Sequence, residues 1–313
     1  PSGHSDVTLE GHWITQPHHT IDLTLSSPNL QTILTLAPKS SAINTSDIKS
    51  WTQHIAPLQI HVSTTLDKIL SNDKSIDVTT IFGKGDKSLS LNGSLKTDKD
   101  FNTLTLDIPR TTLSAKKISN LLPIKDKWEC NIVGGNLTAE AALQIPLTDS
   151  APPLKTTAKI TMANVEGIWK KYAFKKMNSN LSFDSLIPLH LDGEQKVNFD
   201  IGEKLIGNGH VAFMQDNKNS VQIKTLDANI ANGQISASSF TLPMGQNSKK
   251  ESNTTLTLKN FDIATLIPLL DIDGLSGQGT INGTIPLRLN STGIELTDAH
   301  IESTDGGVFS FAP

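Results

Sequence analysis

Hydrophobic and polar residues alternate with a period of two along much of the chain. Aliphatic or aromatic side chains occupy every second position, and the positions between them are mostly Thr, Ser, Asn or Asp. This alternation is typical of antiparallel strands that have one apolar face and one hydrated face. The clearest segments are 20–25, 88–92, 103–108, 196–201, 220–224, 255–258 and 280–289. The pattern therefore predicts an all-β protein.

Turn signals and short helical stripes interrupt the alternation. Some Asn-Gly pairs lie inside an alternating segment, where a bulge or bend is as reasonable an interpretation as a hairpin. The pairs are Asn92-Gly93, Asn208-Gly209, Asn232-Gly233 and Asn282-Gly283. Three stripes have the spacing of a short amphipathic helix: Leu66, Ile69, Leu70; Ile118, Leu121, Leu122; and Ile263, Leu266, Ile267, Leu270, with Asp262 placed to cap the third. Val165, Ile168 and Trp169 share this spacing, but Gly167 argues against a helix there.

A sheet of so many strands has few ways to protect its apolar face. About two dozen strands spaced by ~4.8 Å would extend roughly 115 Å. Such a sheet must close, pack on a second sheet, or curl. A curled sheet would form a trough with an aliphatic interior that accepts acyl chains. A filled sandwich or a β-solenoid has the same alternation, so the pattern alone leaves these alternatives open.

Composition and charge narrow the class of protein. The 313 residues are 36% hydrophobic and 19% charged, with a formal net charge of −4. This balance lacks the basic footprint of a nucleic-acid-binding protein. With a single cysteine, Cys130, the sequence predicts neither an intrachain disulfide nor a cysteine-based metal site. Because no apolar run approaches 18 residues, we expect no transmembrane helix and no signal peptide in this chain.

No combination of residues predicts catalysis or a cofactor. The nine histidines include no HExxH motif and no pair spaced by four residues, so we expect no metal site. Asp271 to Gly274 begins like a calcium loop but lacks the later ligands. The segment 83–88 lacks the spacing of a phosphate-binding loop, and Ser276 does not lie in a GxSxG motif. The sequence therefore predicts a non-enzymatic protein.

The C-terminal segment 255–313 resembles the end region of the YdbH family, a group of AsmA-like bacterial envelope proteins. The shared features are a strand, the short helix from Asp262 to Leu270, the segment Gly274-Leu275-Ser276-Gly277-Gln278-Gly279, the strand containing Ile285-Pro286-Leu287, and Gly306-Gly307-Val308. Residues 162–167, 181–183 and 230–242 are similar to the middle of that family. We divide the chain on this basis into an N-terminal segment (1–99), a middle segment (100–254) and a YdbH-like segment (255–313), all within one elongated β-groove.

The resemblance implies a fold, a function and partners. The implied fold is a long curled antiparallel sheet, called a β-taco, with a few short helices. The implied function is phospholipid transfer between the inner and outer membranes. The implied location is the periplasm, with an N-terminal inner-membrane helix that this chain lacks, so we expect a fragment of a longer protein. The implied partner is a small outer-membrane lipoprotein of the YnbE type, which adds strands near the C-terminal end.

Sixteen alternating apolar residues are the candidate lining of the groove, each in contact with acyl chains. They are Leu89, Leu91, Leu104, Leu106, Ile108, Val197, Phe199, Ile201, Val221, Ile223, Leu256, Leu258, Ile281, Ile285, Leu287 and Leu289. In this interpretation the short helices either plug one end of a groove segment or gate lipid entry. Two other hypotheses stay open: a structural β-solenoid with a packed interior, and an outer-membrane assembly scaffold that acts through edge-strand pairing.

Overall fold

The structure is a computed structural model, and it describes most of the chain from residue 8 onward. The described residues are 8–14, 20–27, 58–65, 76–82, 88–100, 102–121, 129–148, 150, 153–170, 172–186, 189–202, 207–217, 220–230, 232–243, 251–270, 274–290, 293–296, 298–303 and 305–311. The predicted helical stripe at Leu66, Ile69 and Leu70 lies outside them, as do Asp271 to Asp273 and residues 83–87 of the loop-like segment 83–88.

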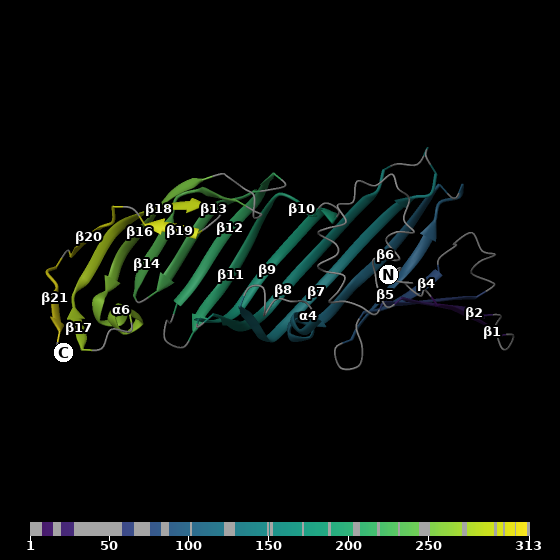
Figure 1. Cartoon of the computed structure of the whole chain (residues 1–313), viewed down its shortest axis with the longest axis horizontal. Helices are drawn as coiled ribbons and strands as arrows, with labels where there is room; N and C mark the ends of the chain where they lie inside the picture. The colour runs from purple at the N-terminus through teal and green to yellow at the C-terminus, as the bar shows by residue number, and fades with distance from the viewer. Residues whose placement is uncertain are drawn as a thin grey trace, which may run out of the picture. The chain divides into compact units, whose positions relative to one another are not determined.

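Antiparallel strands make up nearly all of the described structure (Figure 1). Nineteen strands belong to one sheet, which does not close into a barrel over the residues described. The prediction of an all-β protein with a large antiparallel sheet is therefore confirmed. The chain divides into two compact units: unit 1 contains residues 1–160 and 183–188, and unit 2 contains residues 161–182 and 189–313.

Each strand of unit 1 pairs with the next one along the chain, from β1 to β7. These strands are β1 (Thr8–Ile14), β2 (Thr20–Ser27), β3 (Leu58–Thr65), β4 (Ile76–Phe82), β5 (Leu89–Thr97), β6 (Thr103–Ser114) and β7 (Cys130–Pro146). The next two strands, β8 (Lys155–Trp169) and β9 (Tyr172–Leu186), are divided between the units.

Unit 2 continues with short and long antiparallel strands. They are β10 (Leu189–Leu191), β11 (Glu194–Gly202), β12 (Gly207–Asn217), β13 (Ser220–Ile230), β14 (Gly233–Ala237), β15 (Phe240–Pro243), β16 (Ser252–Asp262), β18 (Thr280–Asn290), β19 (Gly293–Leu296) and β20 (His300–Ser303). A separate two-stranded sheet pairs β17 (Leu275–Gln278) with β21 (Val308–Phe311). Every alternating segment named from the sequence lies in one of the strands of the two units, except that Ser88 directly precedes β5.

The Asn-Gly pairs divide between turns and strand interiors. Asn232-Gly233 lies at the turn between β13 and β14, whereas the other three pairs lie inside β5, β12 and β18. In β18, the side chain of Asn282 contacts the neighbouring strand, since its Oδ1 accepts a hydrogen bond from the backbone N–H of Asn260 at 2.8 Å. Asn260 has a positive φ of 54° and lies where the register between β16 and β18 shifts. The asparagine therefore supports a β-bulge in the neighbouring strand.

Two short helices each follow a strand without a connecting loop. Helix α4 (Ala115–Leu121) continues from β6, and α6 (Ile263–Leu270) continues from β16. Asp262 caps α6, since its Oδ1 accepts the N–H of Ala264 at 3.2 Å and its Oδ2 accepts the Thr265 hydroxyl at 2.6 Å. Neither helix, nor any other helix in the described part of the chain, is long and apolar enough to cross a membrane.

Helix α6 packs closely against glycines of the neighbouring strands. A Cβ at Gly277 of β17 would lie 2.7 Å from side-chain carbons of both Ile263 and Ile267. Phe261 and Ile263 are among the most deeply buried side chains, and a Cβ at Gly233 would meet the Phe261 ring at 2.7 Å. This corner of unit 2 is therefore a small filled core.

Candidate functional site

One face of the sheet in unit 1 is mainly apolar from β1 to β7. Residues in register across an antiparallel pair lie on the same face, so the pairing defines rows of side chains. Two such rows are Leu9–Leu25–Ile60–Thr80–Leu91 and Ile76–Leu95–Leu106–Leu143. The opposite face is mainly polar: in the row His12–Asp22–Ser63–Asp77–Ser94–Asp107–Ala142 only the last residue is apolar. Unit 1 thus has one mainly apolar and one mainly polar surface.

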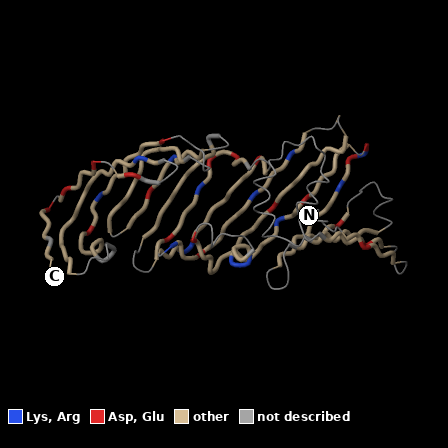
Figure 2. The backbone as a smooth tube through the Cα atoms, in the orientation of Figure 1, with Lys and Arg blue, Asp and Glu red and all other residues tan. Residues whose placement is uncertain are grey.

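Unit 2 has the same division between its faces. Two apolar rows are Val197–Val211–Leu226–Ala237–Leu256–Ile285 and Phe199–Gly209–Ala228–Ile235–Leu258–Gly283–Ile301. The row on the other face reads Asn198–His210–Asp227–Ser236–Thr257–Thr284–His300, in which every residue is polar. Figure 2 shows that charged residues are sparse along these strands and that most positions are uncharged.

The sixteen candidate lining residues all lie on these apolar faces. Five of them, from Leu89 to Ile108, lie on the apolar face of unit 1, and the other eleven lie on that of unit 2. Fourteen have side chains of intermediate exposure, and only Ile223 (7% exposed) and Leu289 (5%) are buried. A filled hydrophobic core would bury most of them, because core side chains are surrounded on all sides.

Several residues on the apolar faces were not among the sixteen. Leu95, Leu143 and Ile235 lie in the rows given above, and Val62 and Val78 lie in a further row of the same face in unit 1. The sequence signal for them was the same period-two alternation, which is weaker in these strands because Thr or Gly replaces an aliphatic residue at some positions. Val78 is 4% exposed, so it belongs to the packed part of this surface.

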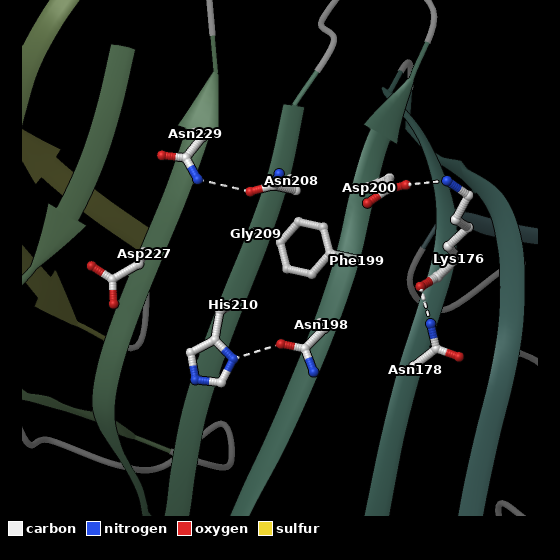
Figure 3. A pocket seen from close by; sticks show the side chains of 10 residues that line it. All are labelled: Lys176, Asn178, Asn198, Phe199, Asp200, Asn208, Gly209, His210, Asp227 and Asn229. Carbon is white, nitrogen blue, oxygen red and sulfur yellow. Dashed lines mark hydrogen bonds and ion pairs between the residues drawn. The ribbon is translucent and has the colours of Figure 1, made fainter. Parts of the chain in front are cut away.

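Unit 2 contains a shallow pocket of about 430 Å³, lined mainly by residues of the polar rows together with Phe199 and Gly209 of an apolar row (Figure 3). Strands β9, β11, β12 and β13 contribute its lining residues. They are Lys176, Asn178, Asn198, Phe199, Asp200, Asn208, Gly209, His210, Asp227 and Asn229. Most of the polar side chains in the pocket are paired with one another or with the backbone.

The polar contacts in the pocket run from strand to strand. His210 Nδ1 lies 2.7 Å from Asn198 Oδ1, and Asn229 Nδ2 donates to Asn208 Oδ1 at 2.9 Å. Lys176 Nζ pairs with Asp200 Oδ2 at 3.0 Å, across the register shift between β9 and β11. Exposed contacts of this kind each contribute little, about 0.2–1 kcal/mol, but together they fix the register of the sheet.

Phe199 and Gly209 form a complementary pair on adjacent strands. A Cβ at Gly209 would lie 2.4 Å from the Phe199 ring, so the ring lies across the glycine. Any larger residue at position 209 would push the ring away from the strand. The pairing of a large with a small residue therefore flattens the surface at this point.

In unit 2, two glutamine side chains form hydrogen bonds with backbone groups at the ends of strands. Gln195 is 2% exposed; its Oε1 accepts the N–H of Ser182 at 2.9 Å, and its Nε2 donates to the carbonyl oxygen of Asp192 at 2.7 Å. Gln215 Oε1 similarly accepts the N–H of Leu191 at 2.9 Å. Because unpaired backbone groups are costly when buried, these glutamines have a structural role.

The described residues hold no arrangement that suggests catalysis. No three His, Cys, Asp or Glu side chains gather there to hold a metal ion. Ser276 lies in β17, where its hydroxyl donates to the Ser310 carbonyl oxygen at 3.5 Å. Partial burial raises the pKa of the Cys130 thiol, which makes it a weaker nucleophile at neutral pH. The apolar faces consist mainly of aliphatic side chains, which can make non-covalent contacts with other apolar groups.

Comparison with known proteins gives one match. The model of the YdbH-like family, described as "Intermembrane phospholipid transport protein YdbH", matches residues 1–313. No curated protein and no solved structure matches the chain.

Proposed function

The chain belongs to the YdbH-like family over its whole length, and from this we propose that it carries phospholipids between the inner and outer membranes of a bacterial envelope. The acyl chains lie along the apolar faces of the two units, and the head groups stay in water. The protein binds and guides lipid without changing it chemically.

The observation that carries this proposal is the incomplete burial of the apolar rows. Fourteen of the sixteen proposed lining side chains keep part of their surface exposed. Each methylene of an acyl chain that leaves water for such a surface gains roughly 0.8 kcal/mol when fully buried. A chain sheltered on one side over several methylenes would therefore bind favourably.

The chemistry of the faces also suits movement along the sheet. The lining residues are Leu, Ile, Val and Phe, whose dispersion contacts have little directionality. Successive rows present similar side chains, so a lipid can shift from one row to the next without breaking hydrogen bonds. This is the behaviour expected of a conduit rather than of a site that fixes one ligand.

The location and the partners are proposed from the family. A protein that moves lipid between these membranes works in the periplasm, where we propose that an inner-membrane helix outside this sequence anchors it. We further propose that a small outer-membrane lipoprotein of the YnbE type adds strands near the C-terminal end. Edge strands can accept such a strand through their backbone N–H and C=O groups.

A second candidate function is an outer-membrane assembly scaffold that acts through edge-strand pairing. It is favoured by large hydrophobic side chains exposed on β19, β20 and β21: Leu296, Ile301, Val308 and Phe311. Such residues at strand edges mark surfaces that bind other chains. A scaffold of this kind would carry no lipid on its apolar faces.

The deciding experiment measures bound lipid and lipid transfer together. The purified protein is extracted with organic solvent, and phospholipid is quantified by mass spectrometry. Transfer of fluorescent phospholipid between two vesicle populations is then compared for Leu106→Arg, on the apolar face of β6, and Thr105→Arg, on the opposite face of the same strand. We expect co-purified phospholipid and slower transfer for Leu106→Arg alone. Absence of lipid, with equal transfer by both variants, would favour the scaffold.

A further inference from the structure

The hairpin between β8 and β9 exposes three large hydrophobic side chains at its tip. Ile168 and Trp169, at the end of β8, are 41% and 51% exposed, and Tyr172, at the start of β9, is 46% exposed. Residues 168–170 and 172–176, here called the aromatic–lysine tip, belong entirely to unit 2. Two aromatic side chains so close together in solvent are unusual in a chain with only 5% aromatic residues.

The same tip concentrates positive charge on an acidic protein. The sequence from 168 to 176 includes four lysines and no Asp or Glu, with Glu166 two positions before it, whereas the whole chain has a net charge of −4. Lys170 and Lys175 are exposed, and Lys176 is paired with Asp200. The ammonium of Lys170 lies 5.6 Å from the centre of the Trp169 ring, so cation and aromatic surface are held side by side.

We propose that the aromatic–lysine tip docks into the head-group layer of a phospholipid bilayer that contains anionic lipids. Trp and Tyr favour this layer because each has an apolar ring and a polar group. Lysines bury their methylene stems beside the rings while their ammonium groups meet lipid phosphates. Charge complementarity favours an anionic bilayer as the binding partner, since a positive tip on a negative protein is attracted locally to an anionic surface.

Helix α4 offers a contrast that separates this proposal from simple charge attraction. Lys116 and Lys117 are a second pair of exposed lysines. No exposed large hydrophobic side chain accompanies them among the described residues of α4, where Ile118 is half-buried. A charge reversal at these two positions changes the net charge by the same amount as a reversal at Lys170 and Lys175, and so provides a matched control.

The docking surface is distinct from the apolar faces on which lipid transfer is proposed. Binding to vesicles through the tip requires no acyl chain on the sheet. A Leu106→Arg variant should therefore lose transfer but keep vesicle binding, whereas a tip variant should lose vesicle binding. The two proposals can thus fail separately.

The test is co-sedimentation of the whole chain with vesicles. Phosphatidylcholine vesicles with about 30 mol% phosphatidylglycerol are compared with pure phosphatidylcholine vesicles, at about 0.05 M and about 0.5 M NaCl. We expect Lys170→Glu/Lys175→Glu and Trp169→Ala/Tyr172→Ala each to weaken binding to the anionic vesicles by about tenfold or more. Lys116→Glu/Lys117→Glu should bind like the unchanged protein. The difference between the lysine variants should vanish at high salt, because screening removes the electrostatic contribution.

Three results would overturn the proposal. The first is equal binding by the unchanged protein and Trp169→Ala/Tyr172→Ala. The second is an equal loss in the α4 control, which would indicate unspecific charge attraction. The third is displacement from vesicles by millimolar inorganic phosphate at constant ionic strength, which would indicate a site for free phosphate. The variant Trp13→Phe/Trp51→Phe/Trp128→Phe keeps Trp169 as its one tryptophan. The fluorescence of Trp169 in this variant should shift to the blue on anionic vesicles. This measurement tests the tip even if a variant of the tip itself folds poorly.

Discussion

The exposure of the apolar rows makes a quantitative prediction about Leu106. This residue lies at the centre of the row Ile76–Leu95–Leu106–Leu143, and one of its Cδ atoms would lie 3.4 Å from a Cβ placed on Gly93. Its side chain is nevertheless only partly buried. Complete burial of a leucine is worth about 1.5–3 kcal/mol, so partial burial is worth less, about 1–2 kcal/mol. Leu106→Ala should therefore cost about 1–2 kcal/mol of unfolding free energy.

Leu289 is the matched control within the same set of residues. It is also a leucine on an apolar face, but it is 5% exposed. Leu289→Ala removes a buried side chain and leaves a cavity, which costs about 2–5 kcal/mol. Replacement by Asp sharpens the contrast: the charge at position 106 stays hydrated, whereas the charge at position 289 must be buried without a partner.

Chemical denaturation followed by circular dichroism measures both costs, and vesicle-to-vesicle transfer measures function. We expect Leu106→Asp to stay folded and transfer lipid slowly, and Leu289→Asp to unfold or lose most of its stability. If Leu106→Ala costs as much as Leu289→Ala, the side chain is packed on all sides in solution. That result would refute the open apolar face and the transfer proposal that depends on it.

Three further predictions follow from single contacts. Gly209→Ala should destabilise the protein by about 1–3 kcal/mol in chemical denaturation, because the new Cβ would meet the Phe199 ring. Adding Phe199→Leu to this variant should restore part of the lost stability. An unchanged denaturation midpoint for Gly209→Ala would contradict the close packing. Gln195→Ala should cost about 2–3 kcal/mol by the same measurement, since it leaves the N–H of Ser182 and the carbonyl oxygen of Asp192 without this partner. Gln234 is exposed, so the control variant Gln234→Ala should cost under about 0.5 kcal/mol. Burial raises the pKa of Cys130, so less thiolate forms at a given pH and the pH midpoint of its alkylation should lie above that of a free cysteine; a midpoint at or below the free value would show that the thiol is not desolvated.

The two faces of each unit contribute differently to the stability of the sheet. On the polar face, cross-strand contacts such as Thr79 with Asn92 and Thr161 with Asn180 tie neighbouring strands together at 3.0 and 2.9 Å. These bonds do not require the apolar face to be covered. The sheet can therefore keep its register through the backbone ladder and the polar rows, which leaves the apolar rows available for a ligand.

Local structure was predictable where it depends on short-range pattern. The strands at 103–108, 196–201 and 280–289 follow from alternation, because successive side chains in a strand point to opposite faces. The helical spacing of Val165, Ile168 and Trp169 was outweighed by Gly167, and these residues lie in β8. Whether an Asn-Gly pair forms a turn or lies within a strand was not predictable, because that depends on the partner strand.

The sequence by itself determined which side chains share a face within each strand, and hence that the chain forms a sheet with one apolar and one polar side. Only the tertiary structure decided which strands lie side by side and in which register. That register aligns Phe199 with Gly209, joins residues of four strands into the pocket, and leaves Leu106 partly exposed while it buries Leu289. The physical reason is that alternation depends on neighbours two residues apart, whereas register and exposure depend on contacts between residues distant in the sequence.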